Sequence, residues 1–595
     1  MKDTLNELIQ FSSFGGQLVL EEVKGNTSGK LNPENNIVTV IGADRNMVAY
    51  IPRSGCPHAK QTQVLMVLRD SNTLESAEKL MKELALDQLA EANHFILLFP
   101  NPIDDGWNYQ EDVNKDNDIQ YLARCFAALT KSKGRVSGFN GLIFYIGTTP
   151  ASSAMVTSLA IKSPLDAAAI MVSEFPKTYQ LPTGKSAQQV AWICGKNVQL
   201  EAYLSLVNKT KKINQDGDVT VHVNSQNECV KHFVSKEGIS AKTVENAWDK
   251  MFSETRRWRN DTFGTYQPRI DFASKGFTKH YEDDSLGANK GFKHTWYEYV
   301  PEQLRGTNKK VPLVLYLHGI NCVGLYGAEQ SGLASIADKE GFVVVFPDPS
   351  IEERWNIWDD PRLPSDVEYI MALIKHMKKV HPIDESRIYI AGFSMGSMFT
   401  NALACSYPEI FAAACAFNGP HTGYLSTLDS SKKGMAQFRP NTVINELPVW
   451  EKTSSPTQDL ADKKKSLYDY RLPFVQFVGL LDGVGFDPDR IWPVNGPNDG
   501  TWPLGIAYWK KFNNIQQENI FSTEFISGIA SPVCVKEDER FIHQVWNSAD
   551  ENLDTLYHLI SVECMPHAVD LKGFEIGWNI IKHYSRNGDG SLTKR

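Results

Sequence analysis

The sequence predicts an α/β protein built from two tandem copies of one fold, each a mostly parallel sheet with helices on both faces. Three observations predict this class. Short apolar runs alternate with amphipathic stretches in the second half. Landmarks of that half recur in the first half in the same order. The chain has 595 residues, which is more than a single hydrophobic core usually serves.

The second half shows the alternation clearly. Apolar runs of about five to seven residues have the length of buried strands, and the longer amphipathic stretches have the length of helices. The expected strands are Val311–Leu317, Gly341–Pro347, Arg387–Ala391, Phe411–Phe417, Phe474–Val478 and Tyr557–Val562, and the expected helices are Asp366–Val380, Met395–Tyr407 and Gly573–Tyr584.

The repeat in the first half is a set of six ordered correspondences, five of them at offsets of about 244 to 248 residues. One chance match is easy to find, whereas six in order are not, so we infer a duplicated fold. The pairs are Val64–Asp70 with Leu313–Gly319, Phe99–Pro102 with Phe346–Pro349, Trp107-Asn108 with Trp355-Asn356, Asp118–Leu129 with Asp366–Met377, Leu142–Gly147 with Arg387–Gly392, and Pro164–Ile170 with Pro408–Ala414.

The domain boundaries follow from these matches. We expect a first domain over residues 1–260, a linker and the start of the second domain over 261–290, and the second domain over 291–595. Two stretches of the second domain, near 421–469 and 496–538, exceed what the minimal fold needs. Both stretches follow expected strands, and loops at the carboxyl ends of the strands in such a sheet usually shape a pocket.

Composition narrows the function classes. The formal net charge is −9 and no long run of Lys or Arg occurs, so we expect no nucleic-acid partner. No apolar stretch is long enough to span a bilayer, so we expect no membrane partner. The start of the chain does not resemble a signal peptide, and the nine cysteines are scattered. These features together predict a cytoplasmic protein.

The chemistry is predicted by the motif Gly392-Phe-Ser-Met-Gly396, which follows an expected strand and precedes an expected helix. In this context the motif indicates the nucleophile turn of an α/β-hydrolase, with Ser394 as the nucleophile. A serine hydroxyl needs a general base and an acid that orients the base.

The acid and the base are expected downstream, in the chain order Ser, Asp or Glu, His. Asp482 ends one apolar strand and His567 follows another, so both are expected at the carboxyl edge of the sheet. Asp487 and Asp489 remain alternatives for the acid. Two alternatives for the base are weaker: His543, and His558, which lies within an expected strand.

The remaining site residues surround this turn. The backbone N–H groups of Met395 and Ile320 are expected to form the oxyanion hole. His318, Trp355 and Trp358 are the expected substrate-binding side chains, although Trp107 matches Trp355 in the first copy, which favours a structural role for Trp355. No metal and no cofactor is expected.

Several segments of the second half resemble bacterial feruloyl esterases and polyhydroxybutyrate depolymerases. They are Leu317–Gly319, Gly341–Pro347, Asp384–Gly396 and Tyr407–Phe411. The resemblance covers roughly residues 296–584 and implies hydrolysis of carboxylic esters by Ser394, Asp482 and His567. Two departures concern the cysteine that commonly follows the His-Gly pair, here displaced to Cys322, and the sequence Val478–Asp482 before the acid.

The first copy lacks the groups that this chemistry requires. Thr149 stands at the position of Ser394, and Pro150 removes a backbone N–H from the oxyanion position. Arg69-Asp70 replaces His318-Gly319, and Val198 stands at the acid position. We therefore expect a non-catalytic first domain with a structural, dimerising or substrate-guiding role.

The sequence thus predicts a serine esterase that acts on a small or oligomeric ester: feruloyl or aryl, acetyl, or a short polyester. A serine peptidase or an acyltransferase of the same fold is the alternative, and a non-catalytic binding scaffold is the third reading. Self-association through the first domain is the expected form of any oligomer.

Overall fold

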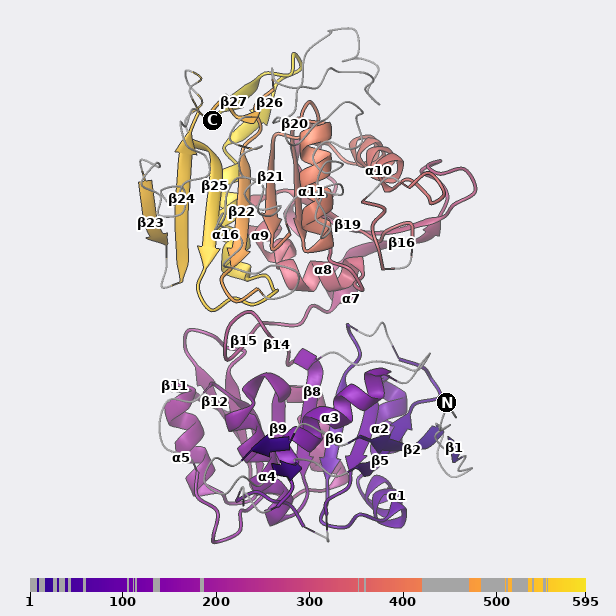
Figure 1. Ribbon diagram of the computed structural model, residues 1–595, viewed down its shortest axis with the longest axis vertical. Coiled ribbons are helices and arrows are strands. Elements are labelled where there is room, and N and C mark those ends of the chain that lie inside the picture. Colours follow the sequence, from indigo (N-terminus) through magenta and orange to yellow (C-terminus); the bar gives the residue numbers. More distant parts are fainter. Residues whose placement is uncertain are drawn as a thin grey trace. The chain divides into compact units, whose positions relative to one another are not determined.

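The computed structural model divides into two compact units, Met1–Arg269 and Ile270–Arg595 (Figure 1). The division falls inside the predicted linker segment, 261–290. The structure describes residues 8–9, 17–24, 29–31, 38–40, 44–56, 60–103, 106–110, 112, 115–131, 140–181, 187–351, 353–357, 360–419, 470–482, 509, 512–515, 533–537, 540–548, 550, 553 and 555–595.

The second unit is built on one ten-stranded sheet. Six neighbouring strands at its centre, β19-β18-β20-β21-β22-β25, run parallel, and antiparallel strands flank them on both sides. In spatial order the strands are β16 (Phe277–Asp283), β17 (His294–Tyr299), β19 (Val343–Pro347), β18 (Val311–Leu317), β20 (Ile383–Phe393), β21 (Ala413–Phe417), β22 (Phe474–Gly479), β25 (Thr555–Val562), β24 (Phe541–Asn547) and β23 (Val533–Glu537).

Helices cover both faces of this sheet because its central strands are apolar on both faces. Alternate residues of a strand point to opposite sides. Leu313 and Leu315 belong to a core with α10 (Asp366–Val380) and α11 (Met395–Ser406), and Figure 1 shows α11 in front of the sheet. Val314 and Tyr316 belong to a second core with the helices of the other face. Those helices are α8 (Gly324–Ser331), α9 (Leu333–Glu340) and α16 (Leu571–Ile581).

The first unit repeats this sheet strand for strand. After one extra edge strand, β1 (Leu8–Ile9), its ten strands occur in the same spatial order and with the same parallel centre. They are β2 (Gln17–Val23), β5 (Arg45–Ile51), β7 (Ile96–Pro100), β6 (Val64–Leu68), β8 (Ile143–Gly147), β9 (Ala169–Val172), β10 (Val190–Cys194), β13 (Lys231–Ser235), β12 (Val219–Asn224) and β11 (Thr210–Asp216).

The helices of the first unit also cover both faces of its sheet. On one face α3 (Asp118–Lys131), α4 (Pro150–Lys162) and α5 (Val198–Val207) contribute to one core. On the other, α1 (Leu74–Glu83), α2 (Leu86–Asn93) and α6 (Ala241–Ala247) contribute to a second core. Both units are therefore α/β sandwiches of helix, sheet and helix, as the fold class predicted.

The smaller elements lie outside the two main sheets. They are the pairs β3 (Gly29–Leu31) with β4 (Val38–Val40), β14 (Arg257–Trp258) with β15 (Thr265–Tyr266), and β26 (Tyr584–Arg586) with β27 (Leu592–Lys594), and the short helix α7 (Phe272–Lys275). Within the described part of the chain, no helix has both the length and the apolar character needed to cross a bilayer.

Equivalent hydrogen bonds occur within each of the two units, in addition to the common topology. The indole N–H of Trp107 donates to the Arg69 carbonyl at 2.8 Å, and that of Trp355 donates to the His318 carbonyl at the same distance. Likewise the Asn108 and Asn356 N–H groups donate at 2.6 Å to the Asp118 and Asp366 carboxylates. These matched contacts support a duplication that extends to loop conformation.

Candidate active site

Ser394 lies on a sharp turn between β20 and α11. Its φ of 55° and ψ of −120° are strained for a residue with a side chain. The neighbouring glycines make the turn possible: a Cβ on Gly396 would lie 2.0 Å from the Leu317 carbonyl oxygen, and one on Gly392 would lie 2.3 Å from the Gly396 carbonyl oxygen. The backbone therefore holds the serine at the end of the strand, as the motif predicted.

The structure brings Ser394, His567 and Asp482 into one chain of hydrogen bonds. His567 Nε2 lies 2.8 Å from Ser394 Oγ. The other ring nitrogen, Nδ1, lies 2.8 Å from one carboxylate oxygen of Asp482 and 3.0 Å from the other. Asp482 is buried, whereas His567 and Ser394 are partly exposed. This is the geometry of a nucleophile, its base and the group that orients the base.

Sheet topology explains why the acid and the base meet. Strands β22 and β25 are parallel neighbours, so the loops after their last residues emerge together. The two loops are in direct contact, since a Cβ on Gly479 would lie 2.4 Å from the Met565 carbonyl oxygen. The Leu481 N–H donates to that same carbonyl at 2.9 Å. These contacts bring the two loops together although 85 residues separate Asp482 from His567.

The loop after β18 lies beside the nucleophile, where an oxyanion hole is expected. A Cβ on Gly319 would lie 3.1 Å from Ser394 Cβ. Ile320, the next residue, is 38% exposed. Met395 is the first residue of α11, so its N–H has no partner within the helix. The predicted donors, Ile320 and Met395, thus belong to segments adjoining the serine.

The structure does not support the substrate-binding role predicted for His318 and Trp355, and it agrees with the structural role that the match to Trp107 favoured for Trp355. Both side chains are completely buried, so neither presents a surface to substrate. The indole N–H of Trp355 is used by the His318 carbonyl, and the ring packs 5.4 Å from that of Phe399. Trp355 thus packs against the loop that follows β18, to which His318 and Gly319 belong. The third predicted contact, Trp358, lies outside the described residues.

The alternatives for the acid and base have different outcomes. Asp487 and Asp489 lie outside the described residues, as do the 421–469 insertion and most of 496–538. His543 and His558 are buried within strands β24 and β25, and their rings are hydrogen-bonded to each other at 2.9 Å. His567 is the histidine that contacts Ser394.

Asp348, just after β19, was missed by the sequence analysis. Its carboxylate accepts a hydrogen bond from the Gly324 N–H at the start of α8 and lies 4.0 Å from His318 Nε2. Burial raises the pKa of Asp348 to about 6. The only signal in the sequence is the repeated landmark Phe346–Pro349, which indicates the duplication and no role for this carboxylate.

The matching turn of the first unit is capped rather than open. Thr149 Oγ1 donates to an Asp70 carboxylate oxygen at 2.7 Å and accepts a hydrogen bond from the Ser152 N–H at 3.1 Å, as the N-cap of α4. Asp70 comes from the loop that corresponds to the one holding Gly319. The five residues between β13 and α6, at 236–240, include no histidine. The hydroxyl is thus held by a carboxylate instead of an imidazole.

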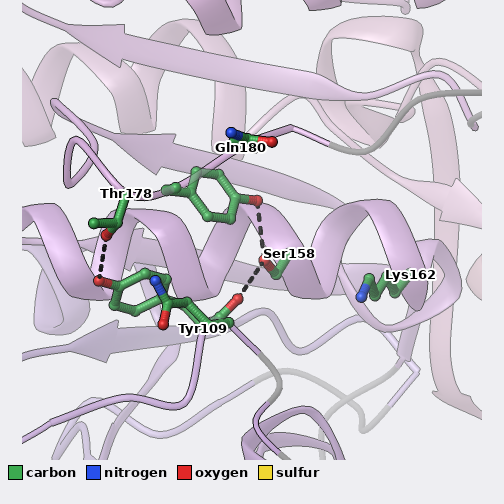
Figure 2. A pocket seen from close by; sticks show the side chains of 7 residues that line it. Tyr109, Ser158, Lys162, Thr178 and Gln180 are labelled. Atoms are coloured by element: carbon green, nitrogen blue, oxygen red, sulfur yellow. Dashed lines mark hydrogen bonds between the residues drawn. The ribbon is translucent and has the colours of Figure 1, made fainter.

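A separate cavity of about 350 Å³ lies in the first unit beside α4 (Figure 2). Ser158 Oγ is hydrogen-bonded to Tyr179 OH at 2.9 Å, and Tyr109 OH lies 3.4 Å from Thr178 Oγ1. Ser158 is eight residues beyond Pro150, or about 12 Å along the helix. The cavity is therefore distinct from the turn at Thr149. Its lining is Tyr109, Gln110, Ser158, Lys162, Thr178, Tyr179 and Gln180.

No group of three or more His, Cys, Asp or Glu side chains suited to hold a metal ion is found among the described residues.

Comparison with known proteins finds esterases that are similar to the second unit. Residues 297–444 match the family model for esterase PHB depolymerase. The resemblance to these esterases is confirmed. Feruloyl esterase B of Thermothelomyces thermophilus is 32% identical over 192 residues, 31% of this chain and 63% of that one. Poly(3-hydroxyalkanoate) depolymerase C of Paucimonas lemoignei is 32% identical over 143 residues, which is 23% of this chain and 33% of that protein.

Acetylxylan esterases are also similar to this chain. A probable acetylxylan esterase A of Aspergillus fumigatus is 29% identical over 162 residues, which is 26% of this chain and 42% of that protein. A solved acetyl xylan esterase from Aspergillus awamori aligns with a TM-score of 0.35 and 15% identity, over 52% of this chain and 99% of that one. The chain spans less than two thirds of the curated relatives, from 33% to 63% of the three named here.

Proposed function

We propose that the second unit is a serine hydrolase that cleaves carboxylic esters through an acyl-Ser394 intermediate. The observation that carries this proposal is the continuous hydrogen-bonded chain from Asp482 through His567 to Ser394. The names of the relatives, which are esterases and a depolymerase, are consistent with it.

In the first half-reaction, Ser394 Oγ attacks the ester carbonyl carbon while His567 Nε2 takes the hydroxyl proton. The carbonyl π electrons move to oxygen, and this oxyanion is stabilised by the N–H groups of Met395 and Ile320. The intermediate then collapses, the bond to the alcohol oxygen breaks, and His567 gives its proton to the leaving alkoxide. Asp482 keeps the ring oriented and stabilises its charged form.

In the second half-reaction, water replaces the alcohol. His567 takes a proton from water as the water oxygen attacks the acyl carbon. The second oxyanion collapses, the bond to Ser394 Oγ breaks, and the proton returns to the serine. The products are a carboxylic acid and free enzyme, so atoms and charge balance without an additional reagent.

The proposed substrates are esters with a feruloyl or other aryl acyl group, an acetyl group, or a short polyester chain. These are the classes that the resemblance implied, and the names of the relatives span the same range. An acyltransferase or a peptidase would use the same three residues with a different acceptor or acyl donor.

For the first unit we propose a non-catalytic role. Thr149 donates its hydroxyl hydrogen to Asp70, and no histidine occurs at 236–240, the segment where the second unit has its base. Pro150 follows Thr149 and carries no N–H for an oxyanion hole.

The test is a panel of feruloyl, aryl, acetyl and 3-hydroxybutyryl esters, hydrolysed by the full chain and by Ser394→Ala. Loss of the nucleophile is expected to lower kcat by about three to six orders of magnitude. Mass spectrometry of a stalled reaction should find the acyl group on the peptide with Ser394. A variant that hydrolyses the preferred ester at the wild-type rate would overturn the proposal.

A further inference from the structure

We propose that Asn418 is a positioning residue that holds the His567 loop in register with the nucleophile and the acid. This inference rests on the proposed function and goes beyond it, because Asn418 touches none of the reacting atoms. Asn418 directly follows β21, and its side chain is completely buried.

The amide of Asn418 binds the backbone on both sides of the base. Its Nδ2 donates to the Ala568 carbonyl at 2.6 Å and to the Pro566 carbonyl at 3.3 Å. These two residues are the immediate neighbours of His567. A single buried NH₂ group thus fixes the peptide units that set the direction of the imidazole.

The other end of the same amide binds the strand that carries the acid. The Gly479 N–H donates to Asn418 Oδ1 at 2.6 Å, three residues before Asp482. Only the NH₂ group can donate to carbonyls and only the oxygen can accept from an N–H, so these contacts fix which way the amide points. One side chain therefore links the loops that carry the base and the acid.

The backbone beside Asn418 binds the nucleophile turn. The Ser394 N–H donates to the carbonyl of Phe417, the preceding residue, at 2.9 Å. The Asn418 N–H donates to the Phe477 carbonyl on β22 at 3.0 Å. Asn418 is hence in contact, directly or through one neighbour, with the segments that present all three members of the triad.

Its backbone conformation is unusual. A φ of 47° lies in the left-handed region, which asparagine tolerates better than most residues with a side chain. The chain turns at this residue, directly after β21 ends. The Asn418 side chain then bonds to the neighbouring loops and not to β21.

The first unit provides an internal comparison. In β8 and β9, Ile146 pairs with Met171, and in β20 and β21 the equivalent pair is Ala391 with Cys415. Three residues further along, the first unit has Glu174, which is exposed, where the second has Asn418. The same fold forms without a buried amide at this position, so the fold as such does not require it. The unit that has the asparagine is the one that has an imidazole to position.

The experiment compares Asn418→Asp and Asn418→Gly with Ser394→Ala and a matched control, in the full chain with the preferred ester. Asn418→Asp keeps the size and an acceptor but loses the donor. Asn418→Gly loses every side-chain contact while accepting the positive φ, so the turn can still form. Kinetic constants and thermal unfolding midpoints are measured for each variant.

The control is Asn513→Asp. Asn513 is also completely buried, and its amide also bonds to backbone: Nδ2 donates to the Leu472 carbonyl at 2.9 Å, and Oδ1 accepts from the Leu472 N–H at 2.8 Å. Its partner Leu472 lies two residues before β22 begins, at the opposite end of that strand from the acid. The substitution therefore removes an equivalent buried contact without touching the triad loops.

Both Asn418 variants are expected to lower kcat by about 100-fold with KM changed less than about twofold, because small displacements of a catalytic group have effects of this size. Asn513→Asp is expected to lower the unfolding midpoint without lowering kcat. If both Asn418 variants keep wild-type kcat while Ser394→Ala is inactive, the positioning role is overturned and the proposed function stands. An equal loss of kcat in Asn513→Asp also overturns it. Activity retained by Ser394→Ala would overturn the proposed function itself.

Discussion

His567 Nε2 lies 2.8 Å from Ser394 Oγ, although the two residues are 173 positions apart in the chain. Five parallel strand pairings join β19 to β25, and the serine and histidine follow two strands of that series, β20 and β25. The relationship is thus a property of the sheet, whose strands present their carboxyl ends along one edge.

The acid of the triad yields the first prediction. Asp482→Asn replaces the carboxylate that lies 2.8 Å from His567 Nδ1 with an amide that can present an N–H to the ring and so favour the wrong tautomer. We expect kcat to fall by about 10⁴-fold while the fold is kept, as for the equivalent change in serine proteases. Steady-state kinetics with the preferred ester provide the measurement, and a loss of less than tenfold would show that another carboxylate is the acid.

The nucleophile turn leads to the second prediction. Gly396→Ala places a Cβ 2.0 Å from the Leu317 carbonyl oxygen, so the turn or the neighbouring strand must move. We expect activity to fall below detection and the second unit to lose at least about 1–3 kcal/mol of stability. Gly588→Ala is the control, since no atom lies within 4 Å of its Cβ position. Equal behaviour of the two variants would contradict the close packing of this turn.

The parts of this site that the sequence predicted are those with a local signature. A strand, a glycine-flanked serine and a helix occupy one continuous stretch, and the terminal positions of Asp482 and His567 follow from apolar runs. The duplication was likewise detectable because its landmarks keep their order. β20, at Ile383–Phe393, begins before the predicted Arg387–Ala391 because Ile383 already pairs with Val311 of β18, ahead of a register shift that precedes the pairing of Ile388 with Leu313.

The roles of other residues depend on contacts distant in sequence. Asn418 only marks the end of an apolar run, whereas its partners lie at Gly479, Pro566 and Ala568. The match to Trp107 favoured a structural role for Trp355, but the groups that bury its ring follow from the fold around it. A pattern of neighbouring letters contains neither kind of information.

The first unit's turn yields a third prediction. Thr149→Ala removes the hydroxyl at the position that corresponds to Ser394, together with its bond to Asp70. Because we propose that this unit is not catalytic, ester hydrolysis by the full chain should keep its kcat and KM within about twofold. The loss of an N-cap should lower the stability of this unit by about 1 kcal/mol. A substantial loss of ester hydrolysis with the second unit still folded would contradict the non-catalytic role.

A buried histidine makes the first unit sensitive to acid, which is the fourth prediction. Burial, and secondarily the neighbouring His222, lowers the pKa of His232 to about 3. The unfolded chain takes up the proton near pH 6.5. Between these values the unfolded state binds more protons, so stability falls as the pH falls, by about 1.4 kcal/mol per pH unit.

The measurement is the unfolding midpoint of the first unit between pH 7 and pH 5. His232→Phe keeps a flat ring to stack on His222, whose ring centroid lies 4.5 Å away, and removes the titration. We expect its midpoint to fall less with acid than that of the wild type. His94→Asn changes an exposed histidine of the same unit and should retain the wild-type pH dependence. Equal slopes for His232→Phe and the wild type would argue against the mechanism.

The fifth prediction concerns Asp348 and has the opposite sign. Burial raises its pKa to about 6 in the folded state, against about 3.9 in the unfolded chain. Between these values the folded state binds more protons, so the stability of the second unit should fall as the pH rises from about 4 to about 6. Asp348→Asn mimics the protonated form and can still accept the hydrogen bond from Gly324.

Asp348→Asn should therefore unfold at a higher temperature than the wild type at pH 8, by an amount that corresponds to at most about 3 kcal/mol, and at nearly the same temperature at pH 4. Asp384→Asn is a control of opposite sign, because hydrogen bonds from Ser386 and Arg387 outweigh burial and lower the pKa of that carboxyl. It should destabilise the unit at pH 8 and have less effect at low pH. If Asp348→Asn also destabilised the unit at pH 8, the charge of Asp348 would be a net stabilising contribution, and the expected sign would be wrong.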